Sequence, residues 1–220
     1  MAVDAPSEES GTEVPRPRPR GGVPLPAALA FAFGIGLLGW GVSAWFHDRE
    51  DAPGAVDVGF YDDMTTHHYQ AIEMANVYVR NGDDPLLREV AAKISFSQAG
   101  DIREMQRALV AWGETGTPDV AMEWMGAPVD QNAQPGMASA AEIERLAEAR
   151  GSQLDDLFSR LMIVHHEGGV HMAEVAADRA RIGTVRDFAR IMAASQRKEI
   201  AELERRRAEL GLRPVGGGER

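Results

Sequence analysis

Cysteine is absent from the 220-residue sequence. Its absence excludes disulfide bonds, thiolate metal ligands, cysteine nucleophiles and a lipid anchor carried by an N-terminal cysteine. Basic residues are outnumbered, because 23 Lys and Arg stand against 34 Asp and Glu, and aromatic residues make up only 6% of the chain. No basic stripe interleaved with aromatic residues is present, so we predict no nucleic-acid partner. A bound metal ion would have to be held by histidine, methionine or carboxylate side chains.

The N-terminal part of the chain predicts a membrane anchor. Residues 1–23 are polar and contain prolines that alternate with arginines, which is typical of a disordered tail. Residues 25–46 carry no charge, and about 20 apolar residues suffice for a helix to cross a bilayer. Arginines precede this run and acidic residues follow it, so the positive-inside rule places the N-terminus in the cytoplasm. We therefore predict a transmembrane helix over 24–46, a linker over 47–55 and an extracytoplasmic domain after it, at the cell membrane.

A cleaved signal peptide is the alternative for the same segment. Val42, Ser43 and Ala44 offer small residues for cleavage, and the domain would then be secreted or periplasmic. The apolar run is longer than the core of about 7–15 residues that signal peptides have, which favours the uncleaved anchor. Small residues four apart, such as Ala32 and Gly36, are compatible with packing of two such helices and hence with a homo-oligomer.

Two stretches of the sequence repeat each other at a constant offset, with Met162 lying 98 positions after Met64. Each copy has a methionine, a histidine pair and a second methionine. These residues are Met64, His67, His68 and Met74 in the first copy, and Met162, His165, His166 and Met172 in the second. The register holds without a gap from Asp57 and Asp155 to Glu104 and Glu202. A constant offset over this length indicates an internal duplication.

Helical periodicity predicts an all-α domain over residues 56–211, and no strand alternation competes with it. The expected long helices span residues 56–81, 85–112, 152–182 and 184–210. Their starts are indicated by capping residues, with Asp84 before Pro85, then Ser152 and Thr184; Ser139 opens a short helix that ends at Gly151.

The halves 56–112 and 152–211 are then two helical hairpins joined by a crossover over 113–151. Since neither hairpin can bury its apolar face alone, they are expected to pair as a four-helix bundle. Residues 212–220 are predicted to form a flexible C-terminal tail, and the arginines of 205–207 a solvated helix face.

The repeated residues are candidate metal ligands, because residues three and four apart share a helix face. If the duplicated helices face each other, four imidazoles and up to four thioethers converge. The candidates are His67, His68, His165, His166, Met64, Met162, Met74 and Met172, with Met122, Met125 and Met137 in the crossover as further thioethers. Imidazole with thioether is a soft ligand set that suits copper, above all Cu(I), better than zinc or haem. No glutamate is followed three residues later by a histidine, which argues against a ferritin-type di-iron centre.

Non-ligand roles remain open for the same residues. The histidines are alternatively buried imidazoles that bond to Gln98 and Gln196, which lie on the apolar seams of the partner helices. Around a metal ion, the same two amides are candidates to orient the ligands by hydrogen bonds. The methionines are alternatively core packing. His171, which breaks the repeat, is a surface residue or an auxiliary ligand.

The motifs resemble domain-of-unknown-function family 305. The resemblance rests on the doubled Met-x-x-His-His motif, on Gln98-x-x-Asp101-Ile102 and on Pro135-Gly136-Met137. It implies a ferritin-like fold and a copper-binding role for the histidines and methionines named above, because some members are copper-binding or copper-resistance proteins of the bacterial periplasm. Gly169 departs from the alanine that is common in the family and predicts looser packing there.

Three functions are compatible with these features. The first is a membrane-anchored extracytoplasmic metal-binding protein that holds copper for buffering, resistance or delivery; its partners are then the metal ion and, through the N-terminal helix, the membrane. The second is a metal-dependent redox enzyme of ferritin-like fold, although no acid–base constellation supports catalytic residues. The third is a helical interaction module whose buried histidines are not ligands.

Overall fold

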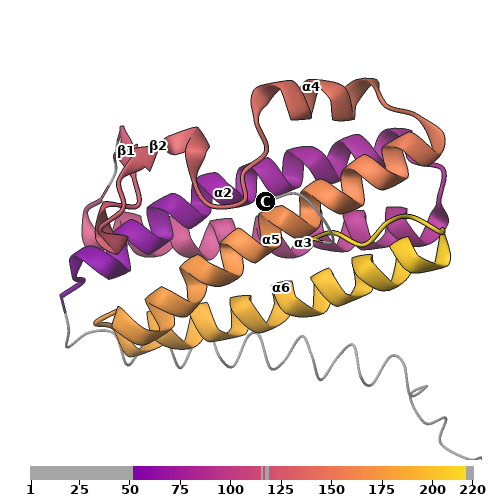
Figure 1. Ribbon diagram of the computed structural model, residues 1–220. Coiled ribbons are helices and arrows are strands. Elements are labelled where there is room, and N and C mark those ends of the chain that lie inside the picture. Colours follow the sequence, from indigo (N-terminus) through magenta and orange to yellow (C-terminus); the bar gives the residue numbers. More distant parts are fainter. Residues whose placement is uncertain (1–51, 115, 117–118, 217–220) are drawn as a thin grey trace, which may run out of the picture. The chain divides into compact units, whose positions relative to one another are not determined.

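The computed structural model describes residues 52–114, 116 and 119–216, and this part of the chain is built almost entirely of helices (Figure 1). The helices are α2 (Ala55–Asn81), α3 (Pro85–Trp112), α4 (Ala140–Glu148), α5 (Gly151–Arg179) and α6 (Gly183–Glu209). The predicted all-α architecture is confirmed. The segment 24–46, predicted to span a membrane, lies outside the described residues. Within them, no helix has both the length and the apolar character of a bilayer crossing.

The crossover between α3 and α4 contains a strand pair that the sequence did not predict. Two-residue strands β1 (Val120–Ala121) and β2 (Val129–Asp130) pair in antiparallel register. The 3-10 turns η1 (Glu123–Met125) and η2 (Gln131–Ala133) follow the two strands in turn. These strands are too short to carry a period-2 pattern, which explains why the sequence did not reveal them.

Two helix starts were predicted wrongly. Helix α5 begins at Gly151 after Arg150, and α6 begins at Gly183 after Ile182, so Ser152 and Thr184 are not the N-caps. Asp57 of α2 accepts the backbone N–H of Ile182, so a contact from the other half of the chain acts at the start of α6. By contrast, the start of α3 is confirmed, and the start of α4 at its Ser139 cap is confirmed as well.

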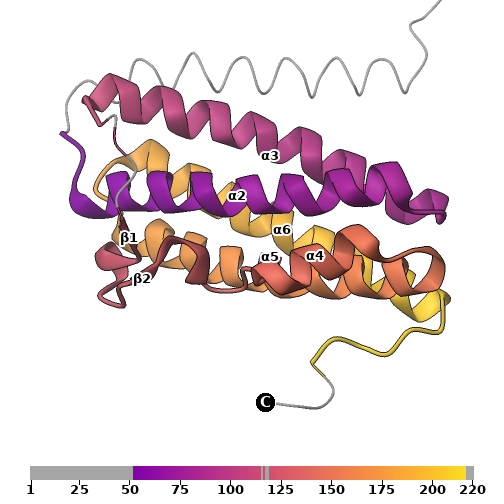
Figure 2. The ribbon, with the colours of Figure 1, turned by 90° about the horizontal axis from the view of Figure 1, so that it is seen from above.

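The two hairpins pair through their first helices. Helix α2 packs along α3 and α5 along α6, while α2 also packs against α5 and α3 against α6 (Figure 2). Helix α4 lies on α2 and α5. Duplicated aromatic residues fill the interior, since Phe60 and Phe158 are both fully buried and Tyr78 stacks on Phe158 at 4.5 Å between ring centroids.

The repeated acids Asp57 and Asp155 each join one half of the domain to the other. Asp57 is fully buried and accepts the N–H groups of Gly54 (2.9 Å), Arg181 (3.1 Å) and Ile182 (2.8 Å). Asp155 accepts the hydroxyl of Tyr78 at 2.5 Å. Burial and this carboxylate raise the pKa of Tyr78, so the phenol keeps the proton that it donates.

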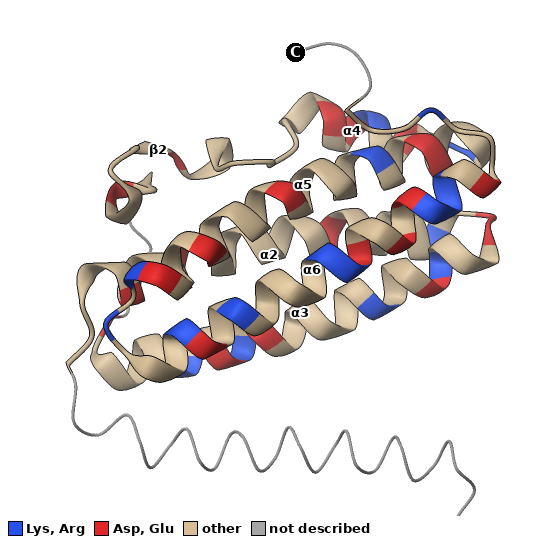
Figure 3. Ribbon diagram, turned by 60° about the horizontal axis from the view of Figure 1, so that its bottom comes forward, with Lys and Arg blue, Asp and Glu red and all other residues tan. Residues whose placement is uncertain are grey.

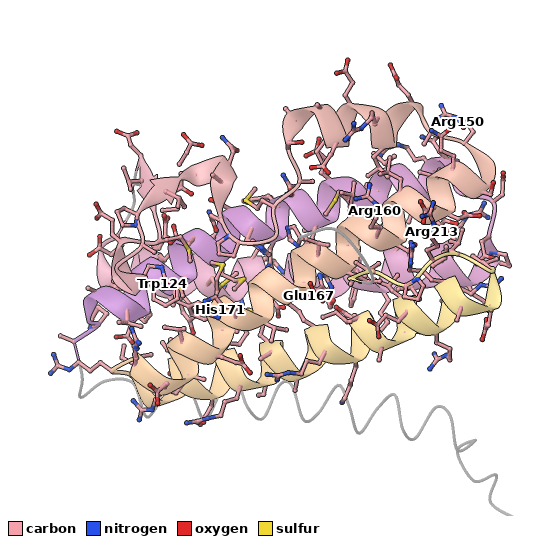
Figure 4. The ribbon with its side chains drawn as sticks, in the orientation of Figure 1. Trp124, Arg150, Arg160, Glu167, His171 and Arg213 are labelled. Carbon is pink, nitrogen blue, oxygen red and sulfur yellow. The ribbon has the colours of Figure 1, made fainter. Side chains whose placement is uncertain are left out.

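Arg207 contradicts the prediction of a solvated arginine face over 205–207. Arg205 is exposed, but Arg207 is only 3% exposed. Its guanidinium donates to the hydroxyl of Ser159 (2.7 Å) and to the carbonyl oxygen of Arg213 (2.6 Å). The fork of donors on arginine suits such a buried junction. Arg207 thereby holds the beginning of the predicted flexible tail against α5, at Arg213, which is labelled in Figure 4.

Charges of both signs alternate along α6 (Figure 3). Lys93 of α3 pairs with Glu202 of α6 at 3.1 Å, with both side chains at least one-third exposed. Exposed pairs of this kind contribute little to stability.

Replacing Asp84 by alanine is expected to lower the free energy of unfolding by about 1–2 kcal/mol at pH 7, mainly through loss of the α3 N-cap. Asp84 accepts the N–H of Leu87 at 2.9 Å and pairs with Arg206. The Arg206 guanidinium holds the pKa of Asp84 below its ordinary value. Since the folded-state pKa is lowered, this stabilisation is present at neutral pH and is lost as the pH falls below about 4.

Urea unfolding at pH 7 and pH 3 measures this dependence. Asp83→Ala, a neighbouring exposed carboxylate, is the matched control and is expected to change stability by less than about 0.5 kcal/mol. An Asp84→Ala deficit of the same size at both pH values would contradict the role given to the ionised carboxylate.

Candidate metal centre

The four histidines of the repeat meet where α2 faces α5. All four are fully buried. The rings of His67 and His165 lie 3.7 Å apart between centroids, and those of His165 and His166 lie 6.1 Å apart. The structure thus brings the predicted imidazoles together from the two halves of the chain.

Three of the four imidazoles are held through Nε2 by an oxygen acceptor. His67 Nε2 lies 3.0 Å from the carbonyl oxygen of Pro135, His166 Nε2 lies 2.9 Å from Glu199 Oε2, and His68 Nε2 lies 3.4 Å from Asp101 Oδ2. A carbonyl or carboxylate oxygen accepts the ring proton, so the lone pair of the neutral ring is on Nδ1. The Nδ1 atoms of these three residues are buried without a hydrogen-bond partner, and His165 has no partner on either nitrogen.

Burial keeps the central pair uncharged. It lowers the pKa of His67 to about 3, with the neighbouring His68 acting in the same direction. Burial also lowers the pKa of His165 well below its ordinary value, reinforced by the other three histidines. Both rings are therefore neutral at physiological pH, the form in which imidazole binds a metal ion.

The four predicted methionine ligands are fully buried. Met64 and Met162 stand one helical turn before His68 and His166. Met74 and Met162 belong to the main apolar core, so core packing accounts for their burial. In the crossover, Met122 is buried, while Met125 and Met137 are partly exposed. Ligation by any of these thioethers stays a prediction.

Gln98 and Gln196 do not hold the imidazoles. Each is only 2% exposed, yet neither amide has a hydrogen-bond partner through its oxygen or nitrogen. Gln196 lies against Gly169, where an added Cβ would be 2.4 Å from Gln196 Oε1. The prediction of looser packing at Gly169 is therefore wrong. The Gln196 amide occupies the space that a methyl group would need at this position, where the first copy has Ala71.

Ten buried polar atoms without partners gather around this centre, on the four histidines, the two glutamines and Glu199. Such atoms are rare in folded proteins and usually face an ion or ordered water. As the side chains stand, no group of three or more His, Asp or Glu in the described part of the chain is arranged so that it could hold a metal ion. In chemical type, buried imidazoles with thioethers nearby are a donor set that suits a soft ion.

The crossover covers the histidines and is fastened at two places. Asp63 accepts the N–H of Met122 and the indole N–H of Trp124, both at 2.7 Å, so it serves the crossover and not the imidazoles. Gln70 bonds both the carbonyl oxygen (2.8 Å) and the N–H (2.7 Å) of Ala138. Trp124 lies beside α2 in Figure 4.

Two glycines allow the crossover backbone to touch α5. An added Cβ at Gly168 would lie 1.9 Å from the carbonyl oxygen of Pro135. Gly136 has φ of +80°, and a Cβ there would lie 2.4 Å from the carbonyl oxygen of Val164. Glycine at both positions is thus required to place Pro135 on His67.

Three residues hold the imidazoles in a role that the sequence did not predict: Pro135 and Asp101, which stand in the motifs that resemble the family, and Glu199. A signal was present for the two acids, because Glu199 lies 98 positions after Asp101 and therefore in register with the duplication. Glu167 and His171 are exposed on α5, as Figure 4 shows, and do not belong to the site.

The comparisons with known proteins agree with the fold. Residues 57–207 match the family described as Domain of unknown function (DUF305). A DUF305 protein from Streptomyces coelicolor, described as secreted, is 35% identical with a TM-score of 0.68, over 74% of this chain and 98% of that one. A DUF305 fragment from Deinococcus radiodurans is 30% identical with a TM-score of 0.63, over 72% and 99%.

A copper-binding protein, CopM, is also similar. Its Cu(I)-bound form is 26% identical with a TM-score of 0.53, over 70% of this chain and 96% of CopM. Its Cu(II)-bound form is 25% identical with a TM-score of 0.58, over 70% and 97%. CopM is known in silver-bound forms as well. Among curated proteins, none matches the chain.

Proposed function

Because the chain belongs to the DUF305 family, we propose that its helical domain binds copper between the two halves of the duplication. The ligands are the imidazoles of His67, His68, His165 and His166. One observation carries the proposal: three of these buried rings are held by an oxygen at Nε2, while their Nδ1 atoms have no hydrogen-bond partner. Histidine ligands characteristically hold their second ring nitrogen in this way.

The chemistry of the surrounding side chains favours a soft ion. The site has no thiolate, since the sequence lacks cysteine, and the buried thioethers of Met64 and Met162 stand one helical turn before His68 and His166. Neutral imidazole with thioether suits Cu(I), and CopM, which shares the fold, binds Cu(I), Cu(II) and silver. Met64 and Met162, with Met74 and Met172 further along the helices, are the proposed additional donors.

We place this domain outside the cytoplasm, held at the membrane by residues 24–46 or released after their cleavage. The charge pattern of that segment supports the placement, as does the similarity to a protein described as secreted. A binding protein at this location would buffer copper, confer resistance to it or deliver it.

Cu(I) affinity is the direct test, measured on the full chain by competition with a chromophoric chelator. A variant with His67, His68, His165 and His166 all changed to alanine is expected to lose binding by at least about 100-fold, because the imidazole donors are gone. Far-ultraviolet circular dichroism checks that this variant keeps its helices.

The matched control is His171→Ala, which removes an exposed imidazole from the same helix and is expected to leave Cu(I) affinity unchanged. Equal Cu(I) binding by the native chain and a folded fourfold variant would show that the repeated histidines are not ligands.

A further inference from the structure

The duplication places a carboxylate behind the second histidine of each pair. Asp101 of α3 faces His68, and Glu199 of α6 faces His166. The two acids are separated by the 98 positions that separate the histidines, so they are counterparts in the repeat. Each half of the domain therefore contains a carboxylate–imidazole pair that joins the two helices of its hairpin.

The two pairs differ in burial. The Glu199 side chain is 3% exposed and lies 2.9 Å from His166, whereas the Asp101 side chain is 33% exposed and lies 3.4 Å from His68. Glu199 Oε1 is buried without a partner. Among the described residues, no lysine or arginine forms an ion pair with Glu199.

A buried carboxylate that no lysine or arginine neutralises is costly to the fold, and a cation bound nearby lowers that cost. A metal ion on Nδ1 of His166 would lie across the ring from the carboxylate that holds Nε2. In that position the carboxylate makes the imidazole a stronger donor and offsets the charge of the ion. Asp101 is partly solvated, so water screens its charge and weakens the same effect in the first half.

We propose that Glu199 positions His166 and supplies the buried negative charge that balances the bound metal ion, an inference that rests on the proposed copper site. It assigns unequal roles to the two halves of the duplication. The second half, through His166 and Glu199, contributes more of the affinity, and the first half, through His68 and Asp101, less.

Glu199→Gln tests this role, because glutamine keeps the size of the side chain and an oxygen that accepts from His166 Nε2–H, and removes only the charge. Cu(I) and Ag(I) affinities are measured on the full chain by chelator competition, and thermal unfolding is followed on the metal-free protein. We expect both affinities to fall by about 10–100-fold. The metal-free variant should be at least as stable as the native protein, since a buried uncompensated charge has been removed.

Two matched variants complete the experiment. Glu204→Gln makes the same change at an exposed position of α6 and is expected to leave affinity unchanged. Asp101→Asn removes the corresponding charge in the first half and is expected to lower the Cu(I) and Ag(I) affinities by less than Glu199→Gln does. A merely structural Glu199 would instead lower metal-free stability in Glu199→Gln and leave the affinities as they were.

The outcomes separate this inference from the proposed function. Native Cu(I) affinity with unchanged affinity in Glu199→Gln overturns the role of Glu199 while the copper site stands. Failure of the native chain to bind Cu(I) or Ag(I) overturns both. Equal losses of metal affinity in Glu199→Gln and Asp101→Asn overturn the unequal roles of the two halves.

Discussion

Replacing Gly168 by alanine is expected to lower the free energy of unfolding by about 2–3 kcal/mol, although alanine ordinarily stabilises a helix relative to glycine. The added methyl group would lie 1.9 Å from the carbonyl oxygen of Pro135 and 2.3 Å from its carbonyl carbon. Both are backbone atoms, and Gln70 fixes the same crossover at Ala138, so the clash cannot be relieved by rotating a side chain. The crossover must move away from α5, and the hydrogen bond from His67 to Pro135 breaks with it.

Urea unfolding measures this cost, and the imidazole N–H resonance of His67 reports the broken hydrogen bond. Gly100→Ala is the matched control, because a Cβ there meets only the end of the Arg103 side chain at 3.7 Å. For this control the free energy of unfolding is expected to rise by about 0.5–1 kcal/mol. If Gly168→Ala gains stability to the same degree, the crossover does not rest on α5 at this point.

Asp57→Ala is expected to lower the free energy of unfolding by about 3–5 kcal/mol. The carboxylate is fully buried and accepts three backbone N–H groups, which alanine would leave without their acceptor. Two of those groups belong to Arg181 and Ile182 in the turn between α5 and α6, so the loss affects the contact between the halves of the domain.

Chemical denaturation followed by circular dichroism measures the effect. Asp57→Asn keeps one acceptor, the amide carbonyl oxygen, and should lower the free energy of unfolding by less than Asp57→Ala does. Asp187→Ala removes an exposed acid of α6 and is expected to change stability by less than about 0.5 kcal/mol. A loss below about 1 kcal/mol for Asp57→Ala would mean that water replaces the carboxylate at this turn.

The helices were predictable because their signals are local. Asp84 and Pro85 start α3 by filling the first turn with an acceptor and a residue that needs no N–H partner, and the sequence alone displays both. The convergence of the histidines was also predictable, because a duplicated motif on paired hairpins places equivalent faces opposite each other.

The contacts that hold the imidazoles were not predictable in the same way. Pro135 reaches His67 across 68 positions, and neither residue type indicates the other. Arg207 was assigned to solvent because arginine is rarely buried, yet Ser159 and the chain end around Arg213 give it acceptors that only the tertiary structure supplies. The predicted start of α6 was wrong for a related reason, since Asp57, which accepts the N–H of Ile182 there, lies far from it in sequence.

The position of the histidines between two hairpins has a consequence for folding. Since α2 and α5 each contribute an imidazole to the close His67–His165 pair, an ion bound at the proposed site would join the two halves of the chain as a cross-link would. Its binding free energy then counts toward the association of the hairpins, by about 2.7 kcal/mol when the free ion is at 100 times its dissociation constant. A copper ion at the proposed site would thereby make the cohesion of the folded domain depend on the supply of the ion in its surroundings.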